Sequence, residues 1–417
     1  MENIADYIHE LATRARAAAA LLVQRTTDEK NAALKRVADA LEAHRAAIGA
    51  ANANDVAKAK AAGLADAMVD RLTLTDARFK AMVEGVRTVA ALPDPVGETI
   101  WTRERPSGIS IKKVRVPFGV VAVVFESRPN VFVDTAALCL KTGNAVILRG
   151  GKEAIETNRE LAKAVKSILG DAVQFIDITD HAAVTELVRA VGLVDVAIPR
   201  GGERLIRAMC EAALVPVLKH YKGVCHIYVD DKADLGMALA ILDNAKTQRP
   251  GVCNAAECLL VHERLAPLFL PMVRAWAKDK GVRLHGPAAL NAEEAEAQRR
   301  GEEVEGIDWE REFLALEMNV GVVKDVRGAI EHINKYGSHH SDCIVTNDAA
   351  RAQEFLRDVD SACVYHNVST RFTDGGEFGM GAEIGISTDK LHARGPMGLE
   401  ELTTYKYQVT GDGVIRK

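Results

Sequence analysis

The spacing of apolar residues along roughly the first 95 positions is typical of amphipathic helices. Two sets of apolar positions recur three to seven residues apart: Ile4, Ile8, Leu11 and Ala15, then Leu34, Val37, Leu41 and Ile48. Because such helices bury one face, we expect a helical N-terminal region that packs on a larger core. The segment Leu92-Pro93-Asp94-Pro95 ends the pattern, since proline lacks the N–H that a helix interior requires.

From residue 120 the pattern changes to short apolar runs separated by amphipathic segments. The runs predict five buried strands at Val120–Phe125, Ala145–Leu148, Val173–Ile176, Val194–Ile198 and Val215–Leu218. The segments between them predict helices near Asp134–Lys141, Ala154–Leu169, Ala182–Val191 and Glu203–Ala213. This alternation predicts an α/β, Rossmann-type domain, with a parallel sheet covered by helices on both faces.

A second alternating unit begins near Val224. Its predicted strands are Val224–Val229, Leu259–Val261, Val320–Val323, Cys343–Thr346 and Val364–His366. Its predicted helices are Leu235–Lys246 and the segments near 265–280, 327–336 and 349–358. The polar segment Asn291–Glu305, rich in Glu and Ala, predicts an exposed helix.

Two further segments alternate between apolar and polar residues in the manner of exposed strands. Ser107–Val116 does so with a slip at Lys112-Lys113, which indicates a β-bulge. Glu400–Val409 alternates more weakly. We expect the two segments to form a β arm that pairs with another subunit, which makes the protein a homo-oligomer.

Composition and charge narrow the class of protein. A net charge of −5 gives no electrostatic basis for binding nucleic acid or an anionic membrane. The longest apolar run, Val116–Phe125, is too short to span a bilayer, and the acidic N-terminus is unlike a signal peptide. Seven scattered cysteines without a C-x-x-C pair predict neither a disulfide framework nor a structural zinc site, so we expect a cytoplasmic protein.

Cys253 is the strongest candidate for chemistry. It stands in Thr247-Gln248-Arg249-Pro250-Gly251-Val252-Cys253-Asn254-Ala255-Ala256-Glu257, a Pro-Gly turn between a predicted helix and a predicted strand. A thiol at such a junction can face a cleft, where backbone N–H groups favour the thiolate. Taken alone, the segment fits a small apolar residue packed at a turn equally well or better.

The wider sequence resembles the gamma-glutamyl phosphate reductase family of the aldehyde dehydrogenase superfamily, essentially from end to end. The resemblance rests on the Cys253 segment and three other blocks: Ser127-Arg128-Pro129-Asn130-Val131, Phe372-Thr373-Asp374-Gly375-Gly376-Glu377-Phe378-Gly379 and Lys390-Leu391-His392-Ala393-Arg394-Gly395-Pro396-Met397-Gly398-Leu399. It implies an aldehyde dehydrogenase-like fold. Its parts would be an NADP-binding domain (1–106 and 117–222), a catalytic domain (223–398) and an oligomerisation arm (107–116 and 399–417).

Cofactor-binding candidates follow two predicted strands. The sequence has no G-x-x-x-x-G-K-[ST], and no G-x-G-x-x-G follows the first parallel strand. Arg149-Gly150-Gly151-Lys152 and Arg200-Gly201-Gly202 are the candidate phosphate loops. Taken alone, the second fits a plain turn equally well, and the first fits a solvated basic turn better. The resemblance places Lys152 where NAD-using relatives carry a glutamate, which favours NADPH. It also implies that Glu312 binds the nicotinamide ribose.

The resemblance assigns further residues to the reaction. Asn130 would donate to the oxyanion beside the Cys253 N–H, and Arg128 would contact the substrate phosphate or carboxylate. His220 holds the place of the glutamate that activates water in hydrolytic relatives; it is either a proton relay or a structural histidine. Arg371 and Asp374 are candidates for the substrate carboxylate and ammonium. We expect no metal at His339-His340, because neighbours on a strand point oppositely.

The implied reaction is NADPH-dependent reduction of L-glutamyl 5-phosphate to L-glutamate 5-semialdehyde through a Cys253 thioester, the second step of proline biosynthesis from glutamate. A glutamate 5-kinase that delivers the acyl phosphate directly is left open. Two alternatives also remain: an aldehyde dehydrogenase whose acyl acceptor is coenzyme A or water, and a catalytically silent dinucleotide-binding or scaffold protein. His220 argues against water, and the blocks around Asn130 and Asp374 argue against coenzyme A.

Overall fold

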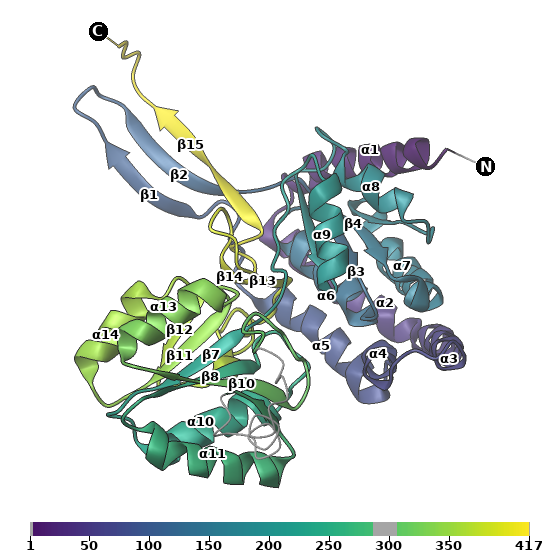
Figure 1. The fold of residues 1–417 in the computed structure, drawn as a ribbon. Helices are drawn as coiled ribbons and strands as arrows, with labels where there is room; N and C mark the ends of the chain where they lie inside the picture. The colour runs from purple at the N-terminus through teal and green to yellow at the C-terminus, as the bar shows by residue number, and fades with distance from the viewer. Residues whose placement is uncertain (1–2, 287–306, 417) are drawn as a thin grey trace. The chain divides into compact units, whose positions relative to one another are not determined.

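The computed structural model describes residues 3–286 and 307–416, which form two compact units (Figure 1). Unit 1 holds the residues up to Lys219, Gly379–Ile386 and the residues from Pro396 on. Unit 2 holds His220–Phe378 and Ser387–Gly395. Within the described ranges, no helix is long and apolar enough to cross a membrane.

The N-terminal region of unit 1 is helical, as the apolar spacing predicts. Its helices are α1 (Ile4–Leu22), α2 (Thr27–Ala43), α3 (Arg45–Ala61), α4 (Asp66–Leu72) and α5 (Asp76–Ala91). A reciprocal capping box between Thr26 and Glu29 begins α2. Helix α5 ends directly before the Pro-rich segment. The predicted core faces are buried; Ile8, Leu11, Leu34 and Leu41 are all less than 5% exposed.

The central sheet of unit 1 is parallel, with strand order β5-β4-β3-β6. Its strands are β3 (Val120–Phe125), β4 (Ala145–Gly150), β5 (Val173–Phe175) and β6 (Val196–Arg200). The α-helices between and after them are α6 (Pro129–Lys141), α7 (Ile155–Leu169), α8 (Ala182–Val188) and α9 (Glu203–Ala212), and short 3-10 turns lie at η1 (Lys152–Ala154) and η2 (Gly170–Ala172). The Rossmann-type prediction is therefore confirmed in its main elements.

The fifth strand predicted at Val215–Leu218 is wrong. This segment makes one isolated bridge, Ala197 with Val217, rather than a ladder. The Pro216 carbonyl accepts from the Ala197 N–H at 2.9 Å, but proline has no N–H to donate. The apolar run is buried enough to resemble a strand, yet it cannot continue the pairing.

Three strands of unit 1 form a separate antiparallel sheet, ordered β1-β2-β15. They are β1 (Thr99–Glu104), β2 (Ser110–Pro117) and β15 (Thr403–Thr410). The predicted pairing of the two alternating segments is confirmed, and β2 pairs with β15 without a break. The predicted bulge at Lys112-Lys113 is wrong, because the extra residue lies in β1, between Thr99 and Trp101. Strand β1 itself was not predicted.

Unit 2 is built on a parallel sheet with strand order β12-β11-β7-β8-β10-β9. Its strands are β7 (Cys225–Val229), β8 (Ala256–His262), β9 (Arg283–His285), β10 (Glu317–Val323), β11 (Ser341–Val345) and β12 (Cys363–His366). Its other elements are α10 (Leu235–Thr247), α11 (Ala266–Lys280), α13 (Val326–Tyr336), α14 (Ala349–Asp358) and the 3-10 turn η3 (Thr370–Phe372). Short strands β13 (Gly385–Ser387) and β14 (Gly395–Met397) pair with each other. The predicted strands are confirmed, β9 was missed, and Asn291–Glu305 lies outside the described residues.

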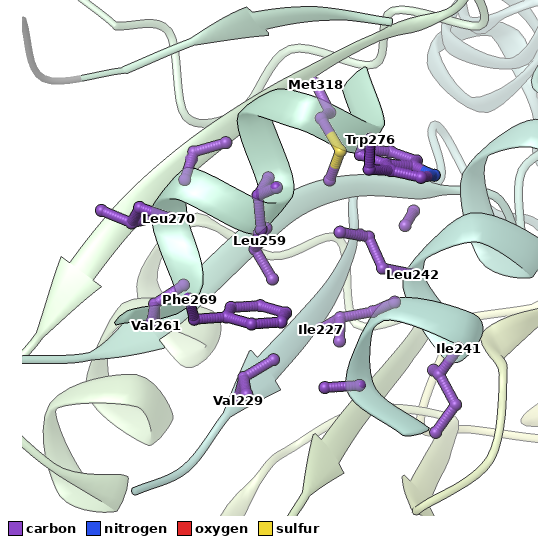
Figure 2. Packing of buried hydrophobic residues seen from close by; sticks show 14 of the residues in the cluster. Ile227, Val229, Ile241, Leu242, Leu259, Val261, Phe269, Leu270, Trp276 and Met318 are labelled. Atoms are coloured by element: carbon purple, nitrogen blue, oxygen red, sulfur yellow. The ribbon is translucent and has the colours of Figure 1, made fainter. Parts of the chain in front are cut away.

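Helices cover both faces of the unit 2 sheet. On one face, apolar side chains of β7, β8, α10 and α11 pack together, among them Ile227, Leu259, Leu242 and Phe269 (Figure 2). On the other face, β7 and β8 present their alternate residues, such as Tyr228, to α13 and α14. The apolar runs carry no two-residue period because both of their faces are buried.

Truncating Phe269 to alanine should lower the free energy of unfolding by about 3–5 kcal/mol, because the ring is fully buried and leaves a cavity. The matched control is the neighbouring Leu268→Ala, whose side chain is 61% exposed and should change stability little. Denaturant unfolding of both variants is the measurement. Equal losses would mean that Phe269 does not belong to the core.

Candidate active site

Cys253 lies in the turn between α10 and β8, at the amino-terminal edge of the unit 2 sheet. Because the strands are parallel, the segments that precede β7, β8 and β11 come together at this edge. These segments carry His220, Cys253 and His340. The predicted strand–turn setting of Cys253 is thus confirmed, and the sheet supplies two imidazoles beside it.

The three side chains form a compact group. One ring nitrogen from each of His220 and His340 and the Sγ of Cys253 all lie within 4.8 Å of one another. The two imidazole rings meet edge to face, with centroids 5.6 Å apart. His340 is fully buried, and its Nδ1 lies 2.8 Å from the Ser341 Oγ. This arrangement leaves an imidazole nitrogen next to the thiol.

The neighbouring histidine behaves differently. The Nδ1 of His339 lies 2.5 Å from the Asp360 carbonyl oxygen, and the residue belongs to no group of converging ligand atoms in the described ranges. His339 and His340 are adjacent in the sequence, but only His340 lies beside Cys253. Sequence reasoning considered the pair only as a metal chelate and missed His340 as a partner of Cys253. The available signal was its place directly before a buried parallel strand.

The electrostatics of the group favour a thiolate. Burial acts to raise the pKa of Cys253, but the charge and hydrogen bonding of His340 and His220 outweigh burial and hold that pKa well below its ordinary value. Burial without such partners has the opposite effect at Cys343, whose pKa rises to about 12. Among these two cysteines, only Cys253 is set up as a nucleophile at neutral pH.

The backbone of Cys253 is held by close packing against the loop before β7. A β-carbon at Gly223 would lie 1.9 Å from the Cys253 carbonyl oxygen, so this position must be glycine. The Sγ of Cys225 also donates to that oxygen, at 3.1 Å. The Gly223 N–H in turn donates to the Glu312 Oε1 at 2.8 Å. Glu312, the candidate ribose ligand, is therefore one residue away from the cysteine turn, and its pKa is raised mainly by burial.

The predicted substrate loop is tied to the same turn. Arg371 donates through Nη1 to the Asn254 Oδ1 and through Nε to the Gln248 Oε1, the latter at 2.9 Å. The Asn254 Nδ2 donates to the Thr373 carbonyl oxygen at 2.8 Å. Burial lowers the pKa of Arg371, and the nearby Arg249 guanidinium lowers it further. Two guanidiniums beside the nucleophile suit an anionic substrate, and Arg249 was not predicted.

Asp374 has a structural role in its own turn. Its Oδ1 accepts from the backbone N–H groups of Gly376, at 2.8 Å, and of Glu377, at 3.3 Å. These bonds shape the Asp-Gly-Gly segment. Its assignment to the substrate ammonium stays a prediction.

The candidate residues of unit 1 gather at the carboxyl edge of its sheet. Arg128 and Asn130 follow β3, Arg149–Lys152 spans the end of β4, and Arg200–Gly202 spans the end of β6. The strand order places the switch point between β3 and β6, where ligands bind in open α/β sheets. Residues far apart in the sequence are thus brought to one edge, as the predicted strands require.

This edge fits a phosphate-bearing cofactor. Arg149 is buried and donates through Nη2 to the Thr179 carbonyl oxygen at 2.9 Å. The Nε atoms of Arg149 and Arg200 are buried without a hydrogen-bond partner in the described chain. Lys152 is exposed beside them. These cationic donors match the phosphate groups of a dinucleotide.

Two features of this sheet edge are explained by contacts within the protein itself, without a bound cofactor. The space in front of Gly150 and Gly151 is filled by Asn158 and Glu153, so packing alone requires small residues there. The Gly202 N–H, at the start of α9, donates to the Glu126 Oε2 at 2.9 Å. A phosphate that used this N–H would have to displace the Glu126 carboxylate. The cations therefore support the cofactor assignment better than the glycines do.

Asn130 lies in the first turn of α6, after Pro129 at its first position. Its Nδ2 donates to the Asp134 Oδ2 at 2.9 Å. Burial raises the pKa of Asp134 to about 6, against the influence of Asn130 and Arg200. Asn130 and Cys253 belong to different units, so their shared role at the oxyanion stays a prediction.

The comparisons with known proteins identify the family to which this fold belongs. The sequence profile of the aldehyde dehydrogenase family matches residues 3–287. An acetylating aldehyde dehydrogenase from Geobacillus thermoglucosidasius, 16% identical, covers 100% of this chain and 99% of its own with a TM-score of 0.69, which shows the fold alone. The chain therefore belongs to the aldehyde dehydrogenase family.

Within that family, the chain belongs with the gamma-glutamyl phosphate reductases. It is 51% identical to the gamma-glutamyl phosphate reductase of Desulforamulus reducens, over 98% of this chain and 99% of the relative. The solved structure of the Thermotoga maritima gamma-glutamyl phosphate reductase is 44% identical, covers 98% of this chain and 100% of its own, and has a TM-score of 0.93. The resemblance inferred from the sequence blocks is confirmed.

His340→Gln should raise the pH at which Cys253 becomes reactive, because the variant loses one imidazolium beside the thiolate. In the wild type a lowered pKa keeps the thiolate present as pH falls, until pH passes through that pKa. The variant should lose alkylation by iodoacetamide at a midpoint roughly one to three pH units higher. Peptide mass spectrometry gives the rate for Cys253, with the partly exposed Cys210 as an internal control in the same sample. An unshifted midpoint would assign thiolate stabilisation to His220 or to the backbone.

Proposed function

We propose that this protein reduces L-glutamyl 5-phosphate to L-glutamate 5-semialdehyde, with NADPH as the reductant and Cys253 as the covalent carrier. The observation that carries the proposal is the partly buried Cys253 thiol beside two imidazoles, in a chain that matches gamma-glutamyl phosphate reductases over nearly its full length. On this proposal the reaction is the second step of proline biosynthesis from glutamate.

The first half of the reaction is acyl transfer. The Cys253 thiolate attacks the carbonyl carbon of the acyl phosphate, the carbon–oxygen bond to the phosphoryl group breaks, and phosphate leaves with the bonding electrons. The Cys253 N–H, with Asn130 as the proposed side-chain donor, stabilises the oxyanion. Because phosphate is a good leaving group, this step needs no strong general acid.

In the second half of the reaction, the imidazoles stabilise the thiolate that is released. NADPH, when bound, supplies the hydride that reduces the thioester carbonyl. The resulting thiohemiacetal oxyanion collapses, the carbon–sulfur bond breaks, and the semialdehyde leaves while sulfur returns to the thiolate form. His340 and His220 keep that thiolate paired with a positive charge, so the cysteine stays ready for the next acyl phosphate.

The choice of acceptor depends on what stands beside the thioester. Hydrolytic relatives carry a glutamate in the place of His220, and that glutamate activates water. The carboxylate of Glu312, the candidate ribose ligand, accepts from the Gly223 N–H. We infer that a histidine in place of that glutamate favours hydride and phosphate over water as partners of the thioester. Coenzyme A as acceptor remains the alternative that the assay below separates.

We assign the ionic groups of the substrate to the guanidiniums near the turn. Arg371 interacts electrostatically with Cys253 and with Arg249, and Arg128 follows β3 in unit 1. The substrate carries a carboxylate and a phosphate, so more than one guanidinium is needed to balance its charge. Asp374 is proposed for the substrate ammonium through the oxygen that its turn does not use.

For the cofactor we propose Arg149, Lys152 and Arg200 as the phosphate ligands, with the adjacent glycines at positions 150, 151, 201 and 202 lining the same edge. Glu312 is the proposed ligand of the nicotinamide ribose. Lys152, in the place of a glutamate found in NAD-using relatives, supports NADPH over NADH.

The antiparallel sheet supports a homo-oligomer. Beyond Thr403 every residue of β15 is exposed, including Tyr405, Tyr407 and Val409 at 49%, 54% and 55%. Three large exposed side chains on β15, which is the last strand of its sheet, suit pairing with a second copy of the chain. We also propose a cytoplasmic location, consistent with seven cysteines that are all free thiols, and we leave direct delivery by a glutamate 5-kinase as a further hypothesis.

The reverse reaction tests the proposed function. Purified protein with glutamate 5-semialdehyde and NADP should form NADPH only when inorganic phosphate is present, and Cys253→Ala should abolish this formation. Cys343→Ala, a buried cysteine away from the site, is the control and should keep its turnover. NADPH formation without phosphate would indicate hydrolysis, and formation that needs coenzyme A instead would indicate the acylating alternative. No formation under any of these conditions would favour a silent protein.

Lys152→Glu should weaken NADPH far more than NADH, because the carboxylate repels a 2′-phosphate and can accept from a free ribose hydroxyl. The measurement is the ratio of kcat/KM for the two cofactors. Lys60→Glu, on the exposed side of α3, makes the same charge change elsewhere in unit 1 and should leave the ratio unchanged. If the ratio is unchanged in both, the 2′-phosphate binds elsewhere, with Arg149 and Arg200 as the next candidates.

A further inference from the structure

A second Cys-His-His group lies inside unit 2, apart from Cys253. It consists of His226 on β7, Cys258 on β8 and His332 on α13. His226 and Cys258 are directly paired across the two parallel strands. One ring nitrogen of each histidine and the Cys258 Sγ all lie within 4.8 Å of one another. The proposed reaction uses none of the three.

The imidazoles of this group have unused nitrogen atoms. His226 and Cys258 are fully buried and His332 is partly buried. The Nε2 atoms of both histidines are buried without a hydrogen-bond partner in the described residues. Buried polar atoms are normally paired, so two unpartnered imidazole nitrogens in a group of converging ligand residues indicate a missing ligand.

The surroundings hold both rings in place. The Asp342 Oδ1 lies 3.1 Å from the His226 Nδ1 and accepts from the His226 backbone N–H at 2.8 Å. The Ser361 hydroxyl donates to the other oxygen of Asp342. The His332 ring packs edge to face against Trp309, with centroids 4.7 Å apart. A carboxylate bound to the far nitrogen of an imidazole is the usual outer support of a metal-binding histidine.

We propose that His226, Cys258 and His332 bind a zinc ion. Thiolate sulfur and imidazole nitrogen are the preferred ligands of Zn²⁺, with bonds of about 2.3 and 2.0–2.1 Å. In a tetrahedral site the ligand atoms are therefore roughly 3.3–3.6 Å apart, and the three atoms here already lie within 4.8 Å of one another. On binding, the Cys258 thiol releases its proton to solvent and a zinc–sulfur bond forms, with no change of oxidation state.

Charge balance supports a divalent ion at this site. The Cys258 thiolate and the Asp342 carboxylate together carry two negative charges, which neutralise Zn²⁺ inside the protein. Three protein ligands leave one tetrahedral position for water. The expectation that this chain holds no metal rested on the adjacent pair His339-His340 and on the spacing of cysteines. It did not consider residues that only the parallel pairing of β7 and β8 brings together.

The test uses Co²⁺ as a spectroscopic probe for Zn²⁺ in the full-length protein. Because Cys253 also lies between two histidines, the background is Cys253→Ala, so that any thiolate-to-cobalt absorption comes from another cysteine. After chelator treatment, titration should give this absorption with one equivalent of Co²⁺, and Zn²⁺ should displace it. Adding Cys258→Ser should abolish the absorption, whereas Cys343→Ser, another buried cysteine of the same sheet, should leave it intact.

A second variant tests the site even if the Cys258→Ser protein does not fold. His332→Gln, at the partly buried ligand, should weaken Co²⁺ binding at least tenfold while Cys258 stays in place. Zn²⁺ should also raise the melting temperature of Cys253→Ala protein but not that of the His332→Gln double variant. Absence of thiolate-to-cobalt absorption in the Cys253→Ala background, or its persistence with Cys258→Ser, overturns the proposal. Neither result bears on the reductase activity, which depends on Cys253.

Discussion

The contact between Gly223 and the Cys253 backbone is the constraint on which the candidate site depends. No side chain fits between the loop before β7 and the cysteine turn, because a β-carbon at position 223 would overlap the Cys253 carbonyl oxygen. This contact holds the turn at the amino edge of the sheet, where the segment before β11 also ends. The nucleophile is therefore positioned by backbone packing and parallel strand order. The same strand order brings in the two imidazoles, because His220 precedes β7 and His340 precedes β11.

The electrostatic character of the site follows from that packing. A buried thiol alone would hold its proton more tightly, as Cys343 does. Two imidazoles reverse this tendency at Cys253, and two guanidiniums nearby favour anionic substrates. The Glu312 carboxylate accepts from the Gly223 N–H, and on the proposed function His220 stands where hydrolytic relatives carry the glutamate that activates water. On the proposed function, these neighbours disfavour hydrolysis of the thioester, which suits an enzyme whose acyl group must be reduced.

Much of the fold could be predicted because apolar patterning is a local property. The helices of the first 95 residues and the strands on both sides of Cys253 follow from residue spacing alone. The strand predicted at Val215–Leu218 was wrong because apolar character does not report backbone hydrogen bonding. Pro216 lies in this apolar run but has no N–H to donate to a strand ladder. The position of the irregularity at Trp101 rather than Lys112 depended on a partner strand that the sequence pattern did not reveal.

The candidate site was predictable only in part. Cys253 and His220 lie in recognisable blocks, whereas His340 and Arg249 acquire a role only when distant segments meet at one sheet edge. The group of His226, Cys258 and His332 was missed for the same reason, since strand register places a residue of β7 next to one of β8. Glycines gave weaker information than expected, because Gly150 and Gly151 are explained by the packing of Asn158 and Glu153.

The central claim is that Cys253 carries the acyl group, and single-turnover acylation tests it most directly. Enzyme mixed with L-glutamyl 5-phosphate in the absence of NADPH should release about one phosphate per active site in a rapid burst. Intact-protein and peptide mass spectrometry should then find a glutamyl adduct on Cys253 that disappears when NADPH is added. A burst without an adduct, or an adduct on another residue, would contradict the account.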